Sequence, residues 1–339
     1  MRALVITEHG PPEVLRVQER PDPEPGPGRV RVRVRAAGIN FADLLARVGL
    51  YAAAPSPPCV VGYEIAGEVD ALGPGTEGFE VGQRVMGGCR FGGYAELAVA
   101  GTGELLPLPD DWSFAEGAAA PVSYATAYAG LVRYGALRAG ERVLIQAAAG
   151  SVGIAATQIA KLVGAEVFGT ASPPKHDAIR GFGVDHPVDY RTHDVVDEVR
   201  RITGEQEPLD LAFDAIGGRS FKGSFALLRP GGRLVCFGAS EVQAGERRSR
   251  ARALRVLAQM PRFHPVKLMS QSKSVIGLNL LELWDSKGSL DEYIGPLREW
   301  TEKGSIRPVV AARFPLAEGA DAHRFVHARE NIGKVVLEP

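Results

Sequence analysis

Cysteine is scarce in this chain, with three residues in 339: Cys59, Cys89 and Cys236. They are odd in number, far apart and without a C-x-x-C pair, which excludes a disulfide framework and a zinc ribbon. We interpret each cysteine as a small buried apolar residue, and a reactive thiol is the alternative.

The chain also lacks an excess of charge and a long apolar run. Its formal net charge is −1, whereas a general nucleic-acid binder needs a basic excess to contact phosphates. A small or acyl-type substrate is therefore the better expectation. No stretch reaches the about 20 apolar residues that span a bilayer, and the N-terminal MRALVITEHG has only a short apolar run. We expect a cytoplasmic protein.

Histidine patterns typical of metal sites are missing as well. The seven histidines contain neither H-x-x-E-H nor H-E-x-x-H spacing, so none is expected to bind a metal. His323 and His327 are four residues apart, and we expect them to share one face of a helix.

Residues 142–175 contain the strongest positive signal. An apolar strand from Arg142 to Ala147 stops at a run of small residues, and helical spacing of apolar residues follows. This order predicts a nucleotide-binding βαβ unit. Small residues let a pyrophosphate approach the backbone, and the unpaired N–H groups of the helix start point at it. The expected contacts are Ala149, Gly150, Ser151, Val152 and Gly153.

This turn departs from G-x-G-x-x-G because Ala148 takes the first glycine position. The string Leu144-x3-Ala148-Ala149-Gly150-Ser151-x-Gly153-x4-Gln158-x2-Lys161 nevertheless resembles the quinone oxidoreductase signature of the medium-chain dehydrogenase/reductase superfamily, with Ser151 where a second glycine is usual. The resemblance covers essentially the whole chain. In residues 241–280 it is closest to the branch of synaptic-vesicle amine-transport-like proteins.

The resemblance implies an α/β fold with a GroES-like, mostly-β catalytic domain and a doubly wound parallel-sheet (Rossmann) domain. We expect the first in residues 1–121 and 283–339, and the NADPH-binding domain in residues 122–282. It also implies a homodimer, in which Ser274 to Leu280 often extends the sheet across the dimer.

The order of expected elements agrees with this fold. A strand–helix alternation after residue 142 favours a parallel sheet. We expect strands at Arg2–Ile6, Val30–Ala36, 184–190, Leu209–Ala215 and Arg233–Gly238, and helices near 175–180, 194–201, 218–228 and 282–302. Ser113 and Glu116 are expected to form a capping box, after which a helix resumes through Tyr134.

The end of the second nucleotide-domain strand predicts cofactor choice. An NAD enzyme has a carboxylate there to bind the ribose diol, but this chain has Thr170, followed by Ser172 and Lys175. Hydroxyls and a cation suit a 2′-phosphate, so we expect NADPH. In the resembling enzymes a lysine and a tyrosine flank that phosphate, which adds Tyr190. The alternative is that Lys175 only begins a solvated helix.

Loops at the strand ends supply further candidates for the cofactor site. Ligands of such sheets bind beyond the strand C-termini, which nominates the loops 214–217 and 237–238. Asp214 could equally be a helix-capping carboxylate. The full set of further cofactor-binding candidates is Asn40, Thr126, Ile216, Phe237, Gly238 and Asn331.

Three positions argue against a catalytic zinc. Asn40, Tyr63 and Val122 stand at about the places where zinc alcohol dehydrogenases of the resembling superfamily carry their ligands. Of the structural-zinc lobe only Cys89 remains. The protein is expected to be free of metal.

Without a metal to polarise a carbonyl, a nicotinamide enzyme is better suited to a quinone or a conjugated C=C. Candidate catalytic residues are Asn40, Tyr51 and Tyr63. Asn40 could donate a hydrogen bond to the carbonyl or the nicotinamide ribose, or merely stabilise a turn. Tyr51 resembles a tyrosine of polyketide-synthase enoyl reductases and is a candidate proton donor. Ala239 replaces a lysine of those enzymes, so solvent is an equal candidate.

Three functions follow. The first is NADPH-dependent reduction of quinones or α,β-unsaturated carbonyl compounds. The second is an enoyl reductase acting on carrier- or CoA-bound thioesters. The third is an NADPH- or lipid-binding protein with little catalysis, because a fold and a cofactor site do not prove turnover.

Residues 241–272 are rich in arginine and leucine, with the basic residues concentrated in 247–262. The pattern predicts a basic amphipathic helix. One interpretation is a solvated surface helix. The other is a peripheral docking patch for anionic headgroups or an acyl-carrier partner.

Overall fold

The structure is a computed structural model that describes residues 1–243, 245–246 and 249–339. The chain forms two compact units. Unit 1 comprises Met1–Ala125, Gly245–Arg248 and Leu281–Pro339, and unit 2 comprises Thr126–Ala244 and Ser249–Leu280.

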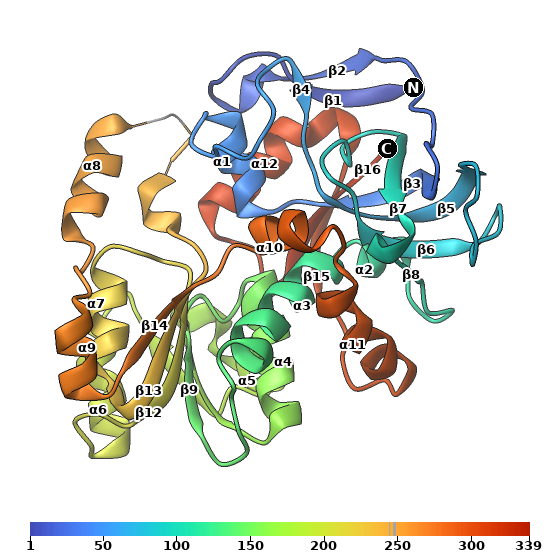
Figure 1. Cartoon of the computed structure of the whole chain (residues 1–339). Coiled ribbons are helices and arrows are strands. Elements are labelled where there is room, and N and C mark those ends of the chain that lie inside the picture. Colours follow the sequence, from blue (N-terminus) through green and yellow to red (C-terminus); the bar gives the residue numbers. More distant parts are fainter. Residues whose placement is uncertain (244, 247–248) are drawn as a thin grey trace. The chain divides into compact units, whose positions relative to one another are not determined.

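Unit 1 is built on two β-sheets (Figure 1). The small sheet has the order β2-β1-β4, and the larger one has the order β15-β16-β3-β5-β6-β8 with β7 also paired to β3. The strands are β1 (Arg2–Ile6), β2 (Leu15–Glu19), β3 (Arg29–Gly38), β4 (Cys59–Val60), β5 (Glu64–Leu72), β6 (Arg84–Gly88), β7 (Leu97–Gly101), β8 (Leu105–Pro107), β15 (Val310–Pro315) and β16 (Lys334–Glu338).

Alternation along β3 separates a buried from a polar face. Val30, Val32 and Val34 are buried in the core of unit 1, because successive side chains of a strand point to opposite faces. Arg33 and Arg35 point the other way and are exposed, and their guanidinium groups pair with carboxylates of the neighbouring strand β5.

Unit 1 also contains helices. The helices with residues in this unit are α1 (Phe41–Arg47), α2 (Phe114–Gly117), α3 (Pro121–Tyr128), α10 (Leu280–Lys287), α11 (Asp291–Glu302) and α12 (Gly319–Ala328). The capping box at α2 is confirmed, since Glu116 N–H donates to Ser113 Oγ and Ser113 N–H to Glu116 Oε2. One helix over 282–302 is wrong: Gly288 has φ +69° and ends α10, a conformation that glycine adopts without strain.

Unit 2 is a doubly wound parallel sheet, as predicted. Its strand order is β11-β10-β9-β12-β13-β14, and every pair is parallel. The strands are β9 (Arg142–Ile145), β10 (Glu166–Ala171), β11 (His186–Asp189), β12 (Leu209–Asp214), β13 (Leu228–Cys236) and β14 (Ser274–Gly277). The helices are α4 (Ser151–Val163), α5 (His176–Gly181), α6 (Val195–Thr203), α7 (Arg219–Ala226), α8 (Arg250–Gln259) and α9 (Pro265–Gln271).

Helices cover both faces of this sheet. Figure 1 shows α4 and α5 on one side and α6, α7 and α9 on the other. The strands are buried on both faces and supply Leu144, Phe168, Val188, Leu209 and Leu234 to one apolar core, which explains their nearly continuous apolar sequence.

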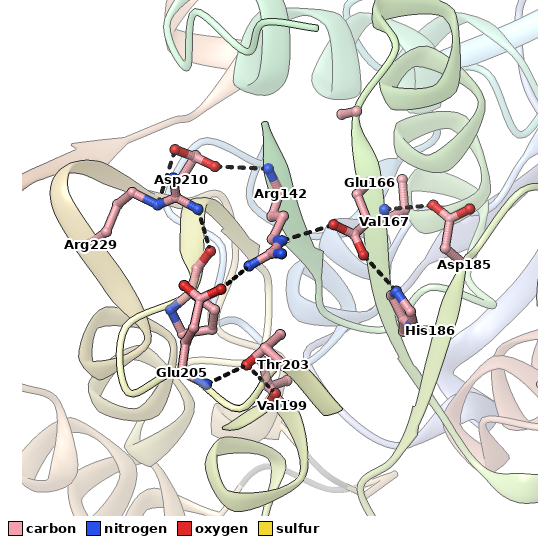
Figure 2. Close-up of polar contacts among 12 residues, drawn as sticks. Arg142, Glu166, Val167, Asp185, His186, Val199, Thr203, Glu205, Asp210 and Arg229 are labelled. Atoms are coloured by element: carbon pink, nitrogen blue, oxygen red, sulfur yellow. Dashed lines mark hydrogen bonds and ion pairs between the residues drawn. The ribbon is translucent and has the colours of Figure 1, made fainter. Parts of the chain in front are cut away.

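Charged side chains join the strands at the N-terminal edge of the same sheet (Figure 2). Arg142 of β9 donates to Glu166 of β10 and to Glu205, both at 2.8 Å. Glu166 also contacts His186 Nε2 of β11 at 2.7 Å. The backbone N–H of Arg142 donates to Asp210 of β12. These contacts set the relative positions of four strand starts, at the end of the sheet opposite the β9–α4 turn.

The basic segment is not the single helix expected over residues 241–272. It contains a short 3-10 turn at Ser240–Gln243, then α8 and α9, while residues 244 and 247–248 lie outside the described residues. Pro261 explains the break, because the preceding Met260 is extended with φ −65° and ψ 133°, and a residue before proline is disfavoured in helical conformation. The strand expected over 274–280 is also shorter, since β14 ends at Gly277 and Leu280 begins α10.

Candidate functional site

The turn between β9 and α4 is tied to the neighbouring strand β10. The N–H of Ala147 donates to Thr170 Oγ1 at 3.0 Å, and the N–H of Ala148 donates to the Thr170 carbonyl at 2.9 Å. Ala147 has φ +56°, an uncommon conformation for a residue with a Cβ. The strand end therefore fixes where the chain reverses into the helix.

At two positions near this turn, a side chain would clash with neighbouring atoms. A Cβ on Gly153 would lie 2.3 Å from the Ala147 carbonyl oxygen, so this position must lack a side chain. A Cβ on Gly169 would lie 2.9 Å from the Ala148 Cβ. Gly169 of β10 therefore leaves the space that the Ala148 methyl group occupies, which explains how alanine replaces the first glycine of the pattern.

The start of α4 presents backbone N–H groups. Gly150 is the N-cap, and the first N–H of the helical ladder belongs to Ile154, which donates to the Gly150 carbonyl at 2.9 Å. The N–H groups of Ser151, Val152 and Gly153 precede that ladder. Together with the positive end of the helix dipole they form a site suited to a phosphate.

A chain of buried polar side chains lies under the strand ends of this face. Thr170 Oγ1 donates to Gln146 Oε1 at 2.8 Å, Gln146 Nε2 donates to Ser224 Oγ at 3.3 Å, and Ser224 donates to Asp214 Oδ2 at 2.7 Å. Sequence reasoning missed Gln146. The signal for it was a single polar residue at the end of an otherwise apolar strand.

The expected 2′-phosphate residues fall at one edge of the sheet. β10 and β11 are parallel neighbours, with Ala171 opposite Asp189, so Ser172 and Tyr190 follow adjacent strand ends. Lys175 ends the short 3-10 turn that begins after Ser172. Thr170 and Ser172 are both buried, at 2 % and 6 % exposed, and the Thr170 hydroxyl makes two hydrogen bonds inside the turn.

Asp214 acts as a turn carboxylate, one of the two roles considered for it. It is buried and accepts hydrogen bonds from Ile216 N–H, Ser220 Oγ and Ser224 Oγ, at 2.7–2.8 Å. Burial raises the pKa of its carboxyl group above the usual value, against the effect of these donors. The carboxylate therefore holds the β12–α7 connection and the first turns of α7.

The remaining cofactor candidates lie in three places. Phe237 stacks on Phe213 with ring centroids 3.9 Å apart, and Gly238 follows it after β13. Thr126 lies in α3 and is 8 % exposed. Asn331 precedes β16 in unit 1, where its Nδ2 donates to the Gly333 carbonyl at 2.8 Å.

In unit 1, Asn40 belongs to a buried charged cluster. Its Nδ2 donates to Glu64 Oε1 and its Oδ1 accepts from Lys334 Nζ, both at 2.7 Å. Lys334 and Glu64 form a close ion pair, and Glu64 Oε2 accepts the Val122 N–H at 3.0 Å. The pairing of β3 with β5 and β16 brings these residues together. We call Asn40, Glu64 and Lys334 the amide–ion-pair cluster.

This cluster fixes the orientation of the Asn40 amide. Both partners of Asn40 are charged and at most 1 % exposed, and hydrogen bonds to charged groups are the stronger ones. The carbonyl oxygen and one N–H of the Asn40 amide take part in these hydrogen bonds. The second amide N–H is left to donate to another group, and the side chain is 8 % exposed. Sequence reasoning missed Lys334 and gave Glu64 no role.

Asp43 and three tyrosines lie beside this cluster. Asp43 accepts hydrogen bonds from Asn40 N–H and Tyr94 Oη, both at 2.8 Å, and burial raises the pKa of its carboxyl group to about 6. Tyr63 is 8 % exposed and burial raises its phenol pKa well above the ordinary value. Burial, followed by the Asp43 charge, raises the pKa of Tyr51 to about 12. Both phenols therefore carry their protons at neutral pH.

The two histidines expected on one helix face do share α12. His327 Nε2 lies 3.0 Å from a guanidinium nitrogen of Arg47, and since arginine can only donate, this nitrogen accepts. Burial lowers the pKa of His327 to about 4 and that of His323 well below its ordinary value. His323 is fully buried, and neither of its ring nitrogens has a hydrogen-bond partner among the described residues.

Comparison with known proteins identifies the family. Residues 26–110 match the family described as alcohol dehydrogenase GroES-like domain, and residues 182–337 match zinc-binding dehydrogenase. The zebrafish (Danio rerio) synaptic vesicle membrane protein VAT-1 homolog is 38 % identical over 99 % of this chain and 69 % of its own length. The chain belongs to the medium-chain dehydrogenase/reductase superfamily.

Two solved structures of this superfamily are similar over nearly the whole chain. The Escherichia coli quinone oxidoreductase complexed with NADPH has a TM-score of 0.86 and 28 % identity, covering 100 % of both chains. The CurK enoyl reductase has a TM-score of 0.86 and 28 % identity, covering 99 % of this chain and 98 % of its own. The chain is thus an oxidoreductase-family protein of the zinc-independent, quinone oxidoreductase-like branch of the superfamily.

The three residues expected at the zinc-ligand positions have other contacts in the structure. Asn40 lies in the amide–ion-pair cluster, the ring of Tyr63 packs edge-on against Phe91 at 6.0 Å, and the Val122 N–H donates to Glu64. Across the described parts of the chain, no group of three or more His, Cys, Asp or Glu side chains is placed to hold a metal. Within those same parts no helix is long and apolar enough to cross a membrane.

The cysteines are less uniform than expected. Cys89 is buried and its thiol lies 3.7 Å from the Gly62 carbonyl oxygen, but Cys59 and Cys236 are partly exposed. Burial raises the pKa of all three thiols, that of Cys236 to about 12. Because the thiolate is the nucleophile, these values disfavour a reactive thiol.

Proposed function

We propose that this protein is a zinc-independent, NADPH-dependent oxidoreductase that reduces quinones or α,β-unsaturated carbonyl compounds by hydride transfer. The observation that carries the proposal is the amide–ion-pair cluster. In this cluster a neutral amide is fixed by two buried charges, at the residue where the sequence resemblance leads us to expect an amide in place of the cysteine ligand of the zinc enzymes.

The nucleotide-binding end of unit 2 fits a dinucleotide phosphate. Gly153 leaves the backbone open to close approach, and the first N–H groups of α4 precede the helical ladder. For the 2′-phosphate we propose Ser172, Lys175 and Tyr190, which follow the adjacent strands β10 and β11. The C-terminal end of β10 and the residues directly after it, 170–175, contain no carboxylate that could bind the ribose diol of NADH. The similar Escherichia coli protein complexed with NADPH supports this choice.

When bound, the reduced nicotinamide supplies hydride, and the remaining task of the chain is to stabilise the charge that develops on the acceptor. Hydride addition to a conjugated acceptor places negative charge on its oxygen, where a fixed donor is most effective. The remaining N–H of Asn40 can serve as that donor. Lys334 donates to the Asn40 carbonyl oxygen, which polarises the amide and strengthens its N–H groups as donors.

Tyr51 is the residue that favours the enoyl reductase alternative. It is partly buried against the core of unit 1, and its raised pKa keeps it protonated. A protonated phenol can deliver the proton that follows hydride addition to an enoyl thioester. The similarity to the CurK enoyl reductase supports this second candidate.

An acceptor panel tests the proposal. Purified protein with NADPH is mixed with a quinone, an enone, an enoyl-CoA thioester and a saturated aldehyde, and loss of nicotinamide absorbance is followed. We expect reduction of the quinone or the conjugated compounds and little reduction of the aldehyde. A Tyr51→Phe variant should slow enoyl reduction and leave quinone reduction nearly unchanged.

Two outcomes would contradict the proposal. NADPH binding without reduction of any quinone, enone or enoyl thioester would favour an NADPH- or lipid-binding protein. A preference for saturated aldehydes would remove the role given to Asn40.

If the proposal is correct, Asn40→Ala lowers kcat by roughly 100-fold or more, as loss of one oxyanion donor does in other enzymes. A weakened NADPH affinity with unchanged kcat would instead assign the Asn40 amide to the nicotinamide ribose.

A further inference from the structure

Large apolar side chains are exposed on two consecutive helices of unit 2. Leu254 and Leu257 of α8 are 68 % and 55 % exposed, and Val266 and Met269 of α9 are 65 % and 76 % exposed. Each pair has i, i+3 spacing, so its two members lie on the same side of their helix. Figure 1 shows α8 and α9 at the same outer margin of unit 2, at the left of the view.

The packing of this segment determines which side chains face outward. Val256 is 6 % exposed and its Cγ1 lies 3.3 Å from the position that a Cβ on Gly218 would take. Between the helices, Phe263 packs on Phe225 of α7 with ring centroids 5.1 Å apart. After α9, the buried Lys273 pairs with Glu207 at 2.7 Å. Because these residues face the unit, the leucines, the valine and the methionine remain outside.

The charge of the segment has one sign. Residues 247–273 contain eight arginines and lysines and no aspartate or glutamate, although the whole chain has a net charge of −1. Four of these cations are exposed in the structure and have no carboxylate partner in its described portion: Arg252, Arg255, Arg262 and Lys267. A surface with exposed leucines and unpaired cations is suited to a partner that is both apolar and anionic.

We propose that α8 and α9 form a docking surface for an anionic lipid bilayer. Leu254, Leu257, Val266 and Met269 enter the boundary between headgroups and acyl chains, and the guanidinium groups bind the lipid phosphates beside them. We call these residues, with Arg252 and Arg255, the α8–α9 surface. The protein lies on the membrane through this surface.

The charge pattern decides between a bilayer and a second copy of the chain. A two-fold contact through the α8–α9 surface brings the same residues of both copies together. The arginines of one copy then face those of the other, with no acidic residue in 247–273 to pair with them. An anionic bilayer gains from both properties of the surface, because apolar burial and headgroup attraction add.

Vesicle sedimentation with the full chain tests this inference. The probes are vesicles of phosphatidylcholine alone and vesicles with added phosphatidylserine. We expect binding to the anionic vesicles that is at least about tenfold stronger than to the neutral ones and that weakens as salt is raised. The double variant Leu254→Gln/Leu257→Gln and the double variant Arg252→Gln/Arg255→Gln should each weaken binding by about tenfold or more.

A matched control uses Val81, which is 68 % exposed in unit 1 between β5 and β6. Val81→Gln removes an equally exposed apolar side chain and should leave vesicle binding unchanged. Reductase rates without vesicles are expected to be the same in all these variants. A failure of the acceptor panel would therefore contradict the proposed reductase function, and a failure of vesicle binding would contradict the docking surface.

Several outcomes would overturn the docking surface. These are absence of binding to phosphatidylserine vesicles, equal binding to neutral vesicles, or full binding by both double variants. A dimer in light scattering that Leu254→Gln/Leu257→Gln dissociates, without vesicle binding by the wild type, would assign the surface to a second copy. Retention on an acidic carrier protein, again without vesicle binding, would assign it to a protein partner.

Discussion

At the scale of single residues, the structure separates side chains with the same expected role. Thr170 and Ser172 are both hydroxyl residues at the end of β10, yet the Thr170 hydroxyl bridges Gln146 and the Ala147 N–H inside the turn. Asn40 has two charged neighbours that a sequence motif around it does not contain. The partners of a side chain, more than its type, decide which role it can have.

Lys334→Met should destabilise the fold strongly. The substitution leaves the Glu64 carboxylate buried without its ammonium partner, and breaking a buried pair on one side costs about 3–5 kcal/mol. The double variant Lys334→Met/Glu64→Gln removes both charges and should recover a large part of that loss. Denaturant unfolding at neutral pH measures both variants. Lys303→Met, which removes an exposed helical ion pair, is the control and should be neutral; an equally small effect of Lys334→Met would contradict the prediction.

Lys175→Ala should weaken NADPH binding by about 1.5–3 kcal/mol if the ammonium contacts the 2′-phosphate, and should leave NADH binding unchanged. Thr170→Val should instead lower the free energy of unfolding by about 1–3 kcal/mol, because Gln146 Oε1 loses its donor and the Ala147 N–H loses its acceptor. Nucleotide fluorescence titration and thermal unfolding separate the two effects. Lys222→Ala, an exposed change on α7, serves as the control, and equal losses for both nucleotides in Lys175→Ala would assign that lysine elsewhere.

At the scale of elements, the β9–turn–α4 unit depends on close contacts between backbone and small side chains. α4 can begin where it does because Gly153 lets the helix lie against the Ala147 carbonyl. β10 contributes both the hydroxyl that binds the turn and the space at Gly169. One strand therefore determines the position of the phosphate-binding N–H groups of its neighbour.

Gly169→Ala should destabilise unit 2 by about 1–3 kcal/mol, as overpacking of a close-packed core does. The new methyl group would lie 2.9 Å from the Ala148 Cβ and also 2.9 Å from a methyl group of Val184. The double variant Ala148→Gly/Gly169→Ala should recover only part of the loss, because the Val184 contact remains. Thermal unfolding measures this, and a fully additive pair of effects would contradict the contact.

Local patterns could be predicted from the sequence, and contacts between distant residues could not. The β9–α4 turn and the capping box of Ser113 and Glu116 depend on residues a few positions apart. The bond between Lys334 and Asn40 joins residues 294 positions apart, and no periodicity indicates it. The helix breaks at Pro261 and Gly288 do have local signals, a proline and a glycine, which apolar periodicity alone does not show.

At the scale of the whole molecule, the buried titratable groups predict acid sensitivity. His323 and His327 are neutral in the folded state with pKa values below the ordinary value, whereas unfolded histidine titrates near about 6.5. Their contribution to stability is thus complete above about pH 6.5 and is lost as the pH falls from there toward 4. Asp43, whose folded pKa is raised to about 6, acts in the opposite direction over about pH 4–6.

The unfolding free energy should therefore decrease between pH 7 and pH 5, by at most about 1.4 kcal/mol per pH unit for each histidine. Denaturant unfolding at several pH values measures the slope. A His323→Phe/His327→Phe variant should show a flatter profile in the same window. A wild-type stability that stays constant or rises on acidification would contradict this account.

The close approach of Ala148 to Gly169 also affects the order in which substitutions at these two positions can accumulate during evolution. A side chain at position 169 meets the Ala148 methyl group at once, whereas the substitution Ala148→Gly removes that obstacle. Substitution at position 148 first is therefore the less costly order, because the reverse order passes through an intermediate destabilised by about 1–3 kcal/mol. In a library that randomises both positions, variants with a side chain at position 169 should survive mainly where Ala148→Gly is also present. Positions 148 and 169, which are 21 residues apart in the sequence, would then vary together.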